Sequence, residues 1–325
     1  MPRHRSALLK GLLAGGALAA ASIAMAQNYP TKPIRFFVPY APGGVGDITA
    51  RLVAQKMTES MKQAVLIENR PGAGSIPAND AALKAEPDGY AIVLTGNGNA
   101  LSASLFKSLP YDIIKDFTHI STLGFFDIAM IAAPGSRFAS AGDVVQYAKQ
   151  NPGKLTIGTV NIGSTQNLAA ELFKSMAGID ALIVPFRESS AVVTAIRSNE
   201  VQIGFEILAP VMSQFRSQAL KPLAIGAAKR FPGLPATPTL QESGVAGYLA
   251  SSWNGISISA KAPRPVVERL SKEVNAAVNA PDVRQRMLEL GVEARGSTPE
   301  EMRALMIADI AKWKAVIERA NIQRQ

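Results

Sequence analysis

The chain contains no cysteine, and this absence removes several classes of site. A disulfide framework, a thiolate nucleophile and cysteine-based zinc or iron–sulfur centres are all excluded. Histidine is almost as scarce, with two residues in 325, and only His119 lies beyond the N-terminal region. His119 is expected beside a strand, where a structural role is favoured over a catalytic one. The lack of cysteine does not decide the compartment, because exported proteins can fold without disulfides.

Long hydrophobic runs are also missing after the N-terminus, so no later segment is expected to span a membrane. The N-terminus itself has a basic start at Arg3, Arg5 and Lys10, followed by a small apolar run over Gly11–Met25. Ala24-Met25-Ala26 has the form that a signal peptidase reads. We therefore expect residues 1–26 to be a cleaved signal peptide and the protein to be periplasmic. The alternative, a membrane anchor, needs roughly 20 apolar residues.

Motifs for catalysis, metals and nucleic acids are missing as well. The chain has no Gly-x-Ser-x-Gly elbow, no His-Glu-x-x-His and no EF-hand loop, so no catalytic residue, metal or cofactor is expected. Removal of the signal peptide leaves 31 lysines and arginines against 25 acids, a net charge of +6. These bases are scattered, which argues against a nucleic-acid partner and favours a solvated surface. A weak attraction for anionic ligands is the other interpretation of this charge.

What is present is an alternation of strands and helices. Compact apolar runs predict strands over residues 34–38, 64–68, 91–94, 155–157, 181–184, 201–205 and 253–260. Helical spacing of apolar residues predicts helices over residues 47–61, 165–176 and 192–198, and another that starts at Pro77. Such alternation indicates right-handed βαβ units and a parallel sheet, and the pattern occurs twice along the chain.

The C-terminal part is predicted to be helical. Pro265, Pro281 and Pro299 each stand where proline opens a helix. Thr298 and Glu301 have the spacing of a capping box for the last helix. The apolar stripe of that helix is more consistent with a core face than with a binding face, and it comprises Met302, Leu305, Met306, Ile310, Trp313 and Ile317.

A glycine-rich loop follows the first predicted strand, in the stretch "VPYAPGGVGDITARLVAQKM" at residues 38–57. It lacks the Lys-Ser/Thr of a Walker A loop and the third glycine of a dinucleotide fingerprint. Glycines before a helix N-terminus suit a carboxylate or another small anion. We expect Asp47 to be the helix N-cap, and Gly44 to need glycine for its backbone angles and for ligand access. A tight turn without a ligand is the alternative.

A second loop of the same layout occurs in "IGTVNIGSTQNL" at residues 157–168. Two further strand ends carry small polar segments that we expect to be loops, "TGNGNALS" at residues 95–102 and "FEILAP" at residues 205–210. Ligands of open α/β sheets bind outside the carboxyl ends of the strands. The glycine-rich loops of the two units therefore predict a ligand cleft between two domains.

Several segments together resemble the tripartite tricarboxylate transporter receptors, also called Bug-type periplasmic solute-binding proteins. They are "YPTKPIRFFVPYAPGGVGDITARL", "ENRPGAGS", "EPDGY", "LPYDIIKDF", "NPGKLTIG", "AAELFKSMAG", "PTLQESG" and "NAPDVRQRMLELGVEA", in order from about Tyr29 to Ile322. The resemblance implies an α/β periplasmic binding-protein fold of type II. It has two α/β domains, two crossing strands and a carboxylate between the domains, held by backbone amides and ordered waters. The receptor then delivers its ligand to a membrane transporter.

The resemblance also implies the residues that bind the ligand. They are Tyr40, Gly43, Gly44, Asp47, Asn97, Thr159, Ser164, Thr165, Asn167, Phe186, Ser189 and Glu206. Glu206 stands where the family commonly has Asp. Four departures lie on the side that tends to contact the distal part of the ligand: Asn167 for His, Asn161 for Gly, Phe186 for Tyr and Glu188 for Gly. A carboxylate ligand is therefore better supported than any particular acid.

The predicted organisation is a discontinuous domain 1, residues 27–125 and 252–325, and a domain 2, residues 126–251. We expect a monomeric solute-binding protein for a small organic mono- or dicarboxylate, with the membrane components of a tripartite tricarboxylate transporter as partners. One alternative is a sensor that presents its ligand-bound form to a signalling protein. A periplasmic enzyme with Asp47 and Glu206 as an acid/base pair is disfavoured, because nothing in the sequence raises either pKa.

Overall fold

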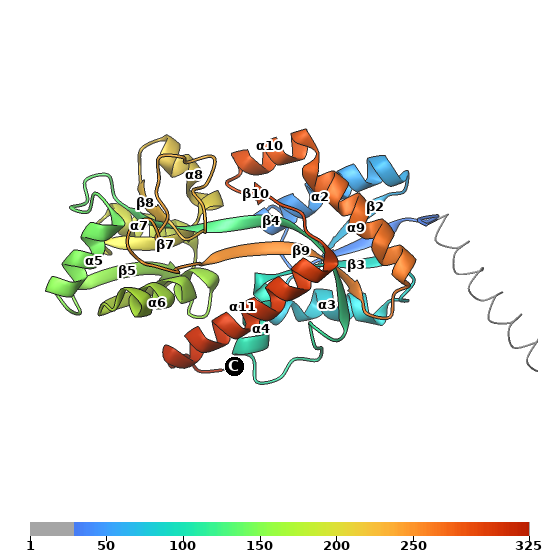
Figure 1. Ribbon diagram of the computed structural model, residues 1–325, viewed down its shortest axis with the longest axis horizontal. Helices are drawn as coiled ribbons and strands as arrows, with labels where there is room; N and C mark the ends of the chain where they lie inside the picture. Colours follow the sequence, from blue (N-terminus) through green and yellow to red (C-terminus); the bar gives the residue numbers. More distant parts are fainter. Residues whose placement is uncertain (1–28, 325) are drawn as a thin grey trace, which may run out of the picture.

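The computed structural model describes residues 29–324, and the predicted signal peptide lies outside this range. The described chain forms two α/β lobes side by side along the long axis of the molecule (Figure 1). Two long strands, β4 (Phe117–Ala132) and β9 (Ser251–Ser259), run between the lobes and continue one sheet through both. The type II binding-protein architecture predicted from the sequence is therefore confirmed, as the relatives described below also show.

The first lobe contains the N-terminal and C-terminal segments. Its further strands are β1 (Ile34–Val38), β2 (Val65–Asn69), β3 (Ala91–Gly96) and β10 (Glu293–Ala294). Its helices are α2 (Val45–Met61), η1 (Ala73–Ser75), α3 (Ile76–Lys84), α4 (Asn97–Leu105), α9 (Arg264–Asn279), α10 (Pro281–Glu289) and α11 (Pro299–Arg319). The strand order is β2-β1-β3-β9-β4, with β1, β2 and β3 parallel and β9 antiparallel to both of its neighbours.

The second lobe is formed by the middle of the chain. Its strands besides β4 are β5 (Leu155–Val160), β6 (Ala181–Phe186), β7 (Ile203–Ile207) and β8 (Lys221–Ile225). Its helices are α5 (Ala141–Gln150), α6 (Thr165–Ala177), α7 (Ser189–Arg197) and α8 (Leu208–Arg216). The order β6-β5-β7-β4-β8 repeats that of the first lobe, with β4 as the antiparallel strand. The sequence prediction of parallel pairing is thus right for three strands in each lobe, whereas every pairing of β4 and of β9 is antiparallel.

Strand β4 passes from one lobe to the other. Residues Phe117 to Asp127 pair with β9, and from Ile128 onward the strand pairs with β7 and then β8. The sequence predicts only that a strand lies beside His119 and does not predict the bounds of β4, because polar residues interrupt its apolar run. One of them, His119, is buried and its Nδ1 lies 2.9 Å from Ser257 Oγ. Burial lowers the pKa of His119 to about 4, so the ring stays neutral and serves the core.

Two segments predicted as loops belong instead to a strand and the helix that follows it. Gly96 ends β3 and Asn97 begins α4, while β7 continues to Ile207 and α8 begins at Leu208. The glycines and asparagines of residues 95–102 indicate a turn on local propensity, but α4 packs extensively on α11, and this contact determines the local structure. The chain therefore turns directly from strand to helix at both places.

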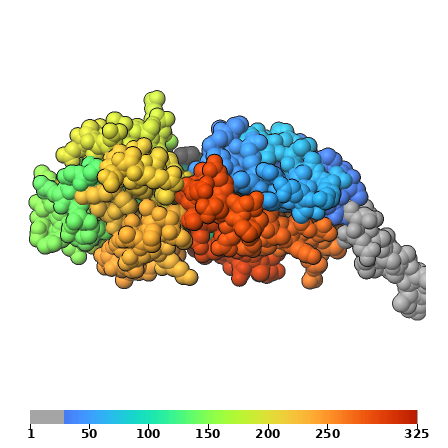
Figure 2. All heavy atoms as spheres, turned by 90° about the horizontal axis from the view of Figure 1, so that it is seen from above, coloured from blue at the N-terminus to red at the C-terminus, as the bar shows by residue number. Residues whose placement is uncertain are grey.

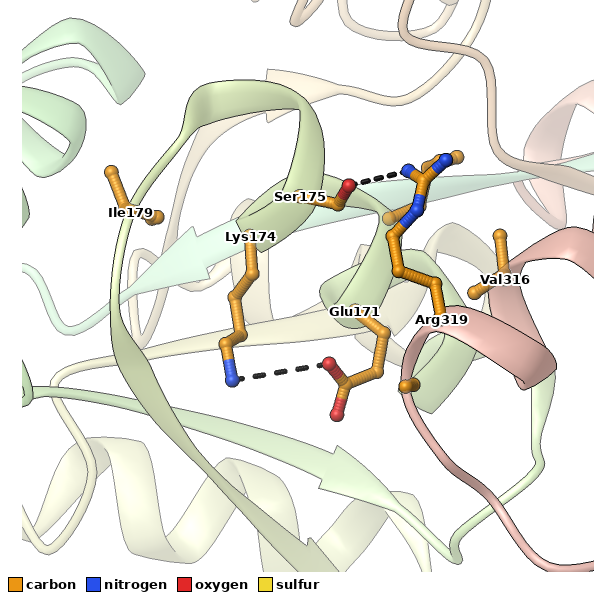
Figure 3. Close-up of a pocket in the computed structure, with 8 residues that line it drawn as sticks. Glu171, Lys174, Ser175, Ile179, Val316 and Arg319 are labelled. Carbon is orange, nitrogen blue, oxygen red and sulfur yellow. Dashed lines mark hydrogen bonds and ion pairs between the residues drawn. The ribbon is translucent and has the colours of Figure 1, made fainter.

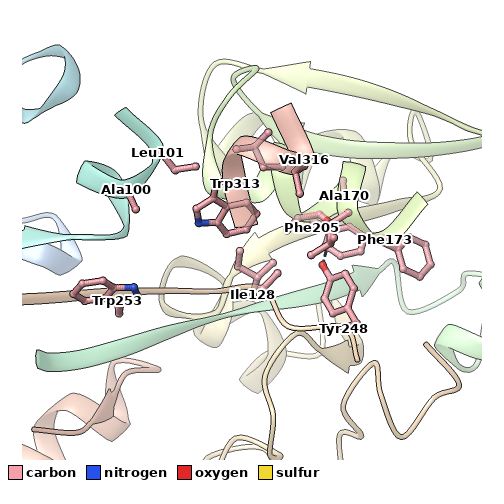
Figure 4. Close-up of a cluster of buried hydrophobic side chains, with 14 of the residues drawn as sticks. Ala100, Leu101, Ile128, Ala170, Phe173, Phe205, Tyr248, Trp253, Trp313 and Val316 are labelled. Atoms are coloured by element: carbon pink, nitrogen blue, oxygen red, sulfur yellow. Dashed lines mark hydrogen bonds between the residues drawn. The ribbon is translucent and has the colours of Figure 1, made fainter. Parts of the chain in front are cut away.

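Helix α11 belongs to lobe 1 in sequence and lies against both lobes (Figure 1). Its predicted capping box is confirmed, because Thr298 Oγ1 accepts from Glu301 N and Glu301 accepts from Thr298 N. The predicted core stripe is confirmed at the buried residues Met302, Met306, Trp313 and Ile317. Figure 4 shows Trp313 between α4 residues and the aromatic cluster of lobe 2. The core thus continues between the lobes on this side.

Candidate functional site

The loop between β1 and α2 is shaped by Gly43 and Asp47. Gly43 has a φ of +85°, a left-handed conformation that favours glycine, and its N–H donates to Asp47 Oδ2 at 2.9 Å. Gly44 is the N-cap, because it has extended backbone angles and its carbonyl accepts the first helical bond from Ile48. The prediction that Asp47 is the N-cap is therefore wrong. Asp47 lies in the first turn and folds the loop back onto the helix.

Gly44 does not need glycine for its backbone angles, which corrects a second expectation. Its φ is −70°, and a Cβ built there would lie 3.6 Å from the nearest atom, Ala41 O. The closest packing occurs at Gly46, where a Cβ would lie 2.6 Å from Tyr40 Cδ2. The Tyr40 ring therefore covers Gly46 while 39% of the side chain stays exposed. Gly46 lies in the glycine-rich motif, but the motif alone does not predict this contact with Tyr40.

Asp47 is 1% exposed, and its oxygens are occupied by protein donors. Oδ1 accepts from Asn69 Nδ2 at 2.7 Å, and Oδ2 accepts from Arg51 Nε at 2.9 Å as well as from Gly43. Burial acts to raise the pKa of Asp47, but the hydrogen bonds from Arg51, Asn69 and Gly43 outweigh it and lower the pKa. Asp47 is thus a charged organiser of the loop. Arg51, four residues later, was a signal that the sequence analysis missed.

The loop between β5 and α6 has the same geometry. Gly163 has a φ of +79° and donates to Asn167 Oδ1 at 3.1 Å, as Gly43 does to Asp47. Ser164 is the N-cap with the extended angles of Gly44, but its Oγ accepts from Asn167 N at 3.1 Å. Asn167 Nδ2 also donates to Thr159 Oγ1 at 3.3 Å. The structure therefore brings Thr159, Ser164 and Asn167 together around one loop.

Asn97 and Thr165 connect the two lobes. Asn97 Nδ2 at the start of α4 donates to Thr165 Oγ1 at the start of α6, at 2.9 Å. Asn97 Oδ1 accepts from Trp313 Nε1 of α11 at 2.6 Å. Asn97 is fully buried, so both ends of its amide are paired inside the protein. Its predicted place in an open loop is wrong, although it does lie where the two lobes meet.

Ser189 and Glu206 form a further group in lobe 2. Glu206 Oε2 accepts from Ser189 Oγ at 2.9 Å and from Gln166 Nε2 at 3.3 Å. Burial raises the pKa of Glu206 to about 7, against smaller opposing hydrogen bonds. Phe186 ends β6 and packs with the apolar cluster under α7 and α8. Gln166 was missed, since one glutamine next to a polar run gives no signal of its own.

The surface is hollowed between the two lobes. Figure 2 shows the molecule hollowed between the blue N-terminal part of lobe 1 and the yellow-green segment of lobe 2. Residues 40–44, 161–162 and 187–188 are exposed. A separate cavity of about 380 Å³ lies between α6 and α11 (Figure 3), lined by Glu171, Lys174 and Arg319 among others. None of the predicted site residues lines that cavity, so it does not belong to the candidate site.

The geometry is that of a solute-binding protein, and comparison with known families agrees. A model described as tripartite tricarboxylate transporter family receptor matches residues 49–322. This chain belongs to that family. Among residues 29–324, no helix is long and apolar enough to cross a bilayer, and no cluster of three or more potential metal ligands was found. The family and its structural neighbours are solute-binding receptors, so the protein is a receptor and not an enzyme.

Relatives support this assignment over most of the chain. A protein of the tcbD–tcbE intergenic region of Pseudomonas sp. is 32% identical, covering 94% of this chain and 93% of that protein. Protein BugT of Bordetella pertussis is 28% identical, with 91% of each chain covered. A Rhodopseudomonas palustris structure, Rpa4515 with adipate, is 29% identical with a TM-score of 0.77, covering 91% of this chain and 99% of that chain. MatC of R. palustris with bound malate is 26% identical with a TM-score of 0.72, covering 89% and 100%.

Proposed function

We propose that this receptor binds a small organic mono- or dicarboxylate between its two lobes in the periplasm. We further propose that it acts as a monomer and delivers the ligand to a tripartite tricarboxylate-type membrane transporter. The supporting observation is the pair of matching loops, one from each lobe, at the carboxyl ends of β1 and β5. Adipate and malate in the structures of two relatives support the chemical class of the ligand.

The main carboxylate site is assigned to the N-terminus of α2. No side chain caps this helix, so its first-turn amides are available to an external anion. Gly43 and Gly44 are exposed, and nothing stands within 4 Å of a Cβ at Gly43. Asp47 fixes the loop by accepting a hydrogen bond from Gly43, and the Tyr40 ring would border the proposed site. The remaining predicted residues, from Asn97 to Glu206, are assigned to the lobe 2 side and to the junction between the lobes.

The proposed domain division is supported by the pairing of the two long strands. Strand β4 changes partners between Asp127 and Ile128, and β9 begins at Ser251. We therefore propose that residues 27–125 and 252–325 move as one domain, and residues 126–251 as the other. Opening and closure would bend the chain at these two places, close to the ligand loops.

The test is a thermal-shift and calorimetric screen of mono- and dicarboxylates on the mature protein. Gly44→Val should reduce affinity at least ten-fold, because a branched side chain would occupy the space in front of the amides. Its φ of −70° suits valine, so the fold should survive. Gly135→Val is the matched control, since this glycine is also exposed and no atom lies within 4 Å of its Cβ position.

Three outcomes would contradict the proposal. If Gly44→Val binds the ligand as tightly as the Gly135→Val control, the assignment of the carboxylate site to the N-terminus of α2 is wrong. Ligand recovered after long incubation and analysed by mass spectrometry should be unchanged, and a turnover product would contradict a pure receptor. Absence of binding to every acid in the screen would disprove the carboxylate assignment itself.

A further inference from the structure

Glu206 is a buried acid, and only one of its two carboxyl oxygens has a hydrogen-bond partner among the described residues. Its side chain is 0% exposed, and Oε2 accepts from Ser189 and Gln166. Its other oxygen, Oε1, has no hydrogen-bond partner among the described residues. A buried carboxyl with one oxygen unpaired is costly unless a proton, water or ligand satisfies it. This oxygen is therefore a vacant polar contact inside lobe 2.

The partners of Glu206 place it at two helix N-termini. Ser189 is the first residue of α7, which has no side-chain cap, and Gln166 is the second residue of α6. The positive ends of both helices therefore favour a negative charge at this point. Gln166 also follows Thr165, the residue that bonds Asn97 across the lobes. Glu206 is thus bonded to Gln166, the chain neighbour of the residue that joins the two lobes.

We propose that Glu206 determines which distal group the ligand carries. As a carboxylate, it occupies the positive helix ends itself, repels a second carboxylate and accepts from a hydroxyl or ammonium group. As a neutral carboxyl, it leaves the helix ends to the ligand and can donate a hydrogen bond to a second carboxylate. The receptor would then prefer hydroxy or amino monocarboxylates at high pH and dicarboxylates at low pH. This inference rests on the proposed function, because it concerns the far end of the same cleft.

The surroundings of Glu206 allow this change of charge near neutral pH. Its pKa is raised to about 7 by burial, against hydrogen bonds from Ser189 and Gln166, and no charged side chain contributes. The charged residues of the elements packed against it are Asp127 on β4, Glu171 and Lys174 along α6, Arg187, Glu188 and Arg197 around α7, and Arg216 on α8. Arg187 and Glu188 are exposed and of opposite sign, so they add little net charge.

The test compares adipate with 6-hydroxyhexanoate, two probes of equal length that differ in the distal group. Calorimetry at pH 6.5 and pH 8.5 gives the ratio of their affinities. In the parent protein the preference for adipate should fall at least ten-fold over this range, following the protonated fraction of a group with a pKa about 7. In Glu206→Gln, which carries an amide of the same shape, the ratio should stay constant.

Two further variants keep the test decisive. Ser189→Ala removes one donor to the carboxylate, so the midpoint of the pH dependence should move upward, which a merely structural role would not cause. Asp127→Asn removes the other nearby buried acid with a raised pKa and should leave the midpoint unchanged. An affinity ratio independent of pH in the parent, with both probes bound, would overturn the inference alone. Failure of both probes to bind at either pH would also overturn this inference, whereas the proposed function is overturned only if every acid of the carboxylate screen fails to bind.

Discussion

The loops after β1 and β5 share a backbone but differ in charge and capping. In both, a glycine with positive φ donates its N–H to a side chain four residues later, and the next residue is an extended N-cap. The receiving side chain is the anion Asp47 in lobe 1 and the neutral Asn167 in lobe 2. The N-cap is Gly44, without a side-chain acceptor, in lobe 1, and Ser164, which accepts from Asn167 N, in lobe 2.

This difference assigns distinct tasks to the two lobes. The lobe 1 loop is fixed from beneath by a charged network, and its helix N-terminus is left open to an external anion. In lobe 2 the serine already satisfies part of the helix end, and the acid of this lobe, Glu206, is buried. In the proposed function, the first-lobe loop would hold the carboxylate, and Glu206 of the second lobe would select the distal group.

The largest expected effect is the loss of Asp47. Asp47→Ala should lower the free energy of unfolding by about 3–4 kcal/mol, because hydrogen bonds to a charged group contribute about 1.5–3 kcal/mol each and are not additive. Asn167→Ala should lower it by about 1–2 kcal/mol, since its bonds are neutral. Ligand affinity should fall more in Asp47→Ala. Urea unfolding and calorimetry on the same preparations provide both numbers.

Asp47→Asn is the control for shape. It keeps the size of the side chain, so its free energy of unfolding and its ligand affinity should lie between those of the parent and those of the alanine variant. Equal losses for Asp47→Ala and Asn167→Ala would show that the charged network does not distinguish the two loops.

The second prediction uses the opposite pKa directions of the two acids. The pKa of Asp47 is lowered, so its stabilisation is present above its ordinary value of 3.8 and is lost as the pH falls below it. The pKa of Glu206 is raised from 4.5 to about 7, so the folded state retains a proton that the unfolded state has released. The free energy of unfolding should therefore fall between pH 4.5 and 7.5, by on the order of 2–4 kcal/mol.

Urea unfolding from pH 3 to pH 8 checks both directions. Glu206→Gln should remove most of the decline above pH 4.5, leaving a smaller part due to Asp127, whose pKa burial raises to about 6. Asp47→Asn should reduce the loss of stability below pH 4. A Glu206→Gln profile that matches the parent would mean that Glu206 is ionised in the folded protein throughout.

Much of this arrangement was visible in the sequence, and what was missed has a physical pattern. Strand β1 was predicted at its observed bounds, and α6 and β2 to within one residue at each end, because their apolar spacing is strong. The helix after Pro77 and the three proline-led helices were also found, since proline at a helix start is a local signal. These elements are determined mainly by their own residues.

The errors concern features determined by distant contacts. Residues 97–105 form a helix because α11, two hundred residues later, covers them. Asp47 is not an N-cap because Asn69, on β2, and Arg51 hold it in the first turn. The orphan oxygen of Glu206 depends on residues from α6 and α7. The candidate binding residues were therefore named from the motif, but their partners required the structure.

The third prediction separates the two glycines of the first loop. Gly43→Ala should lower the free energy of unfolding by about 1–2 kcal/mol, because φ is positive there. Gly44→Ala should change it by less than about 0.5 kcal/mol, since φ is −70° and the added Cβ meets no atom closer than 3.6 Å. In lobe 2, Ser164→Ala should cost about 1 kcal/mol through its lost cap. Thermal and urea unfolding of the three variants test whether these losses of stability differ although the two loops share one backbone conformation.

The smallest expected effect is that of salt on affinity. Asp47 neutralises Arg51 in lobe 1 and Asn167 is uncharged in lobe 2, so neither loop presents a free cation to the ligand. Affinity should then fall only about two- to three-fold between low and physiological salt, because screening acts on the remaining exposed charges. Arg187→Gln should change affinity by less than about two-fold, since this exposed side chain is not assigned a ligand contact. Calorimetry at two salt concentrations on both proteins decides. A loss of several tens of fold in the parent, abolished in Arg187→Gln, would move the main carboxylate contact from α2 to the rim of lobe 2, and the two loops would exchange the tasks assigned to them.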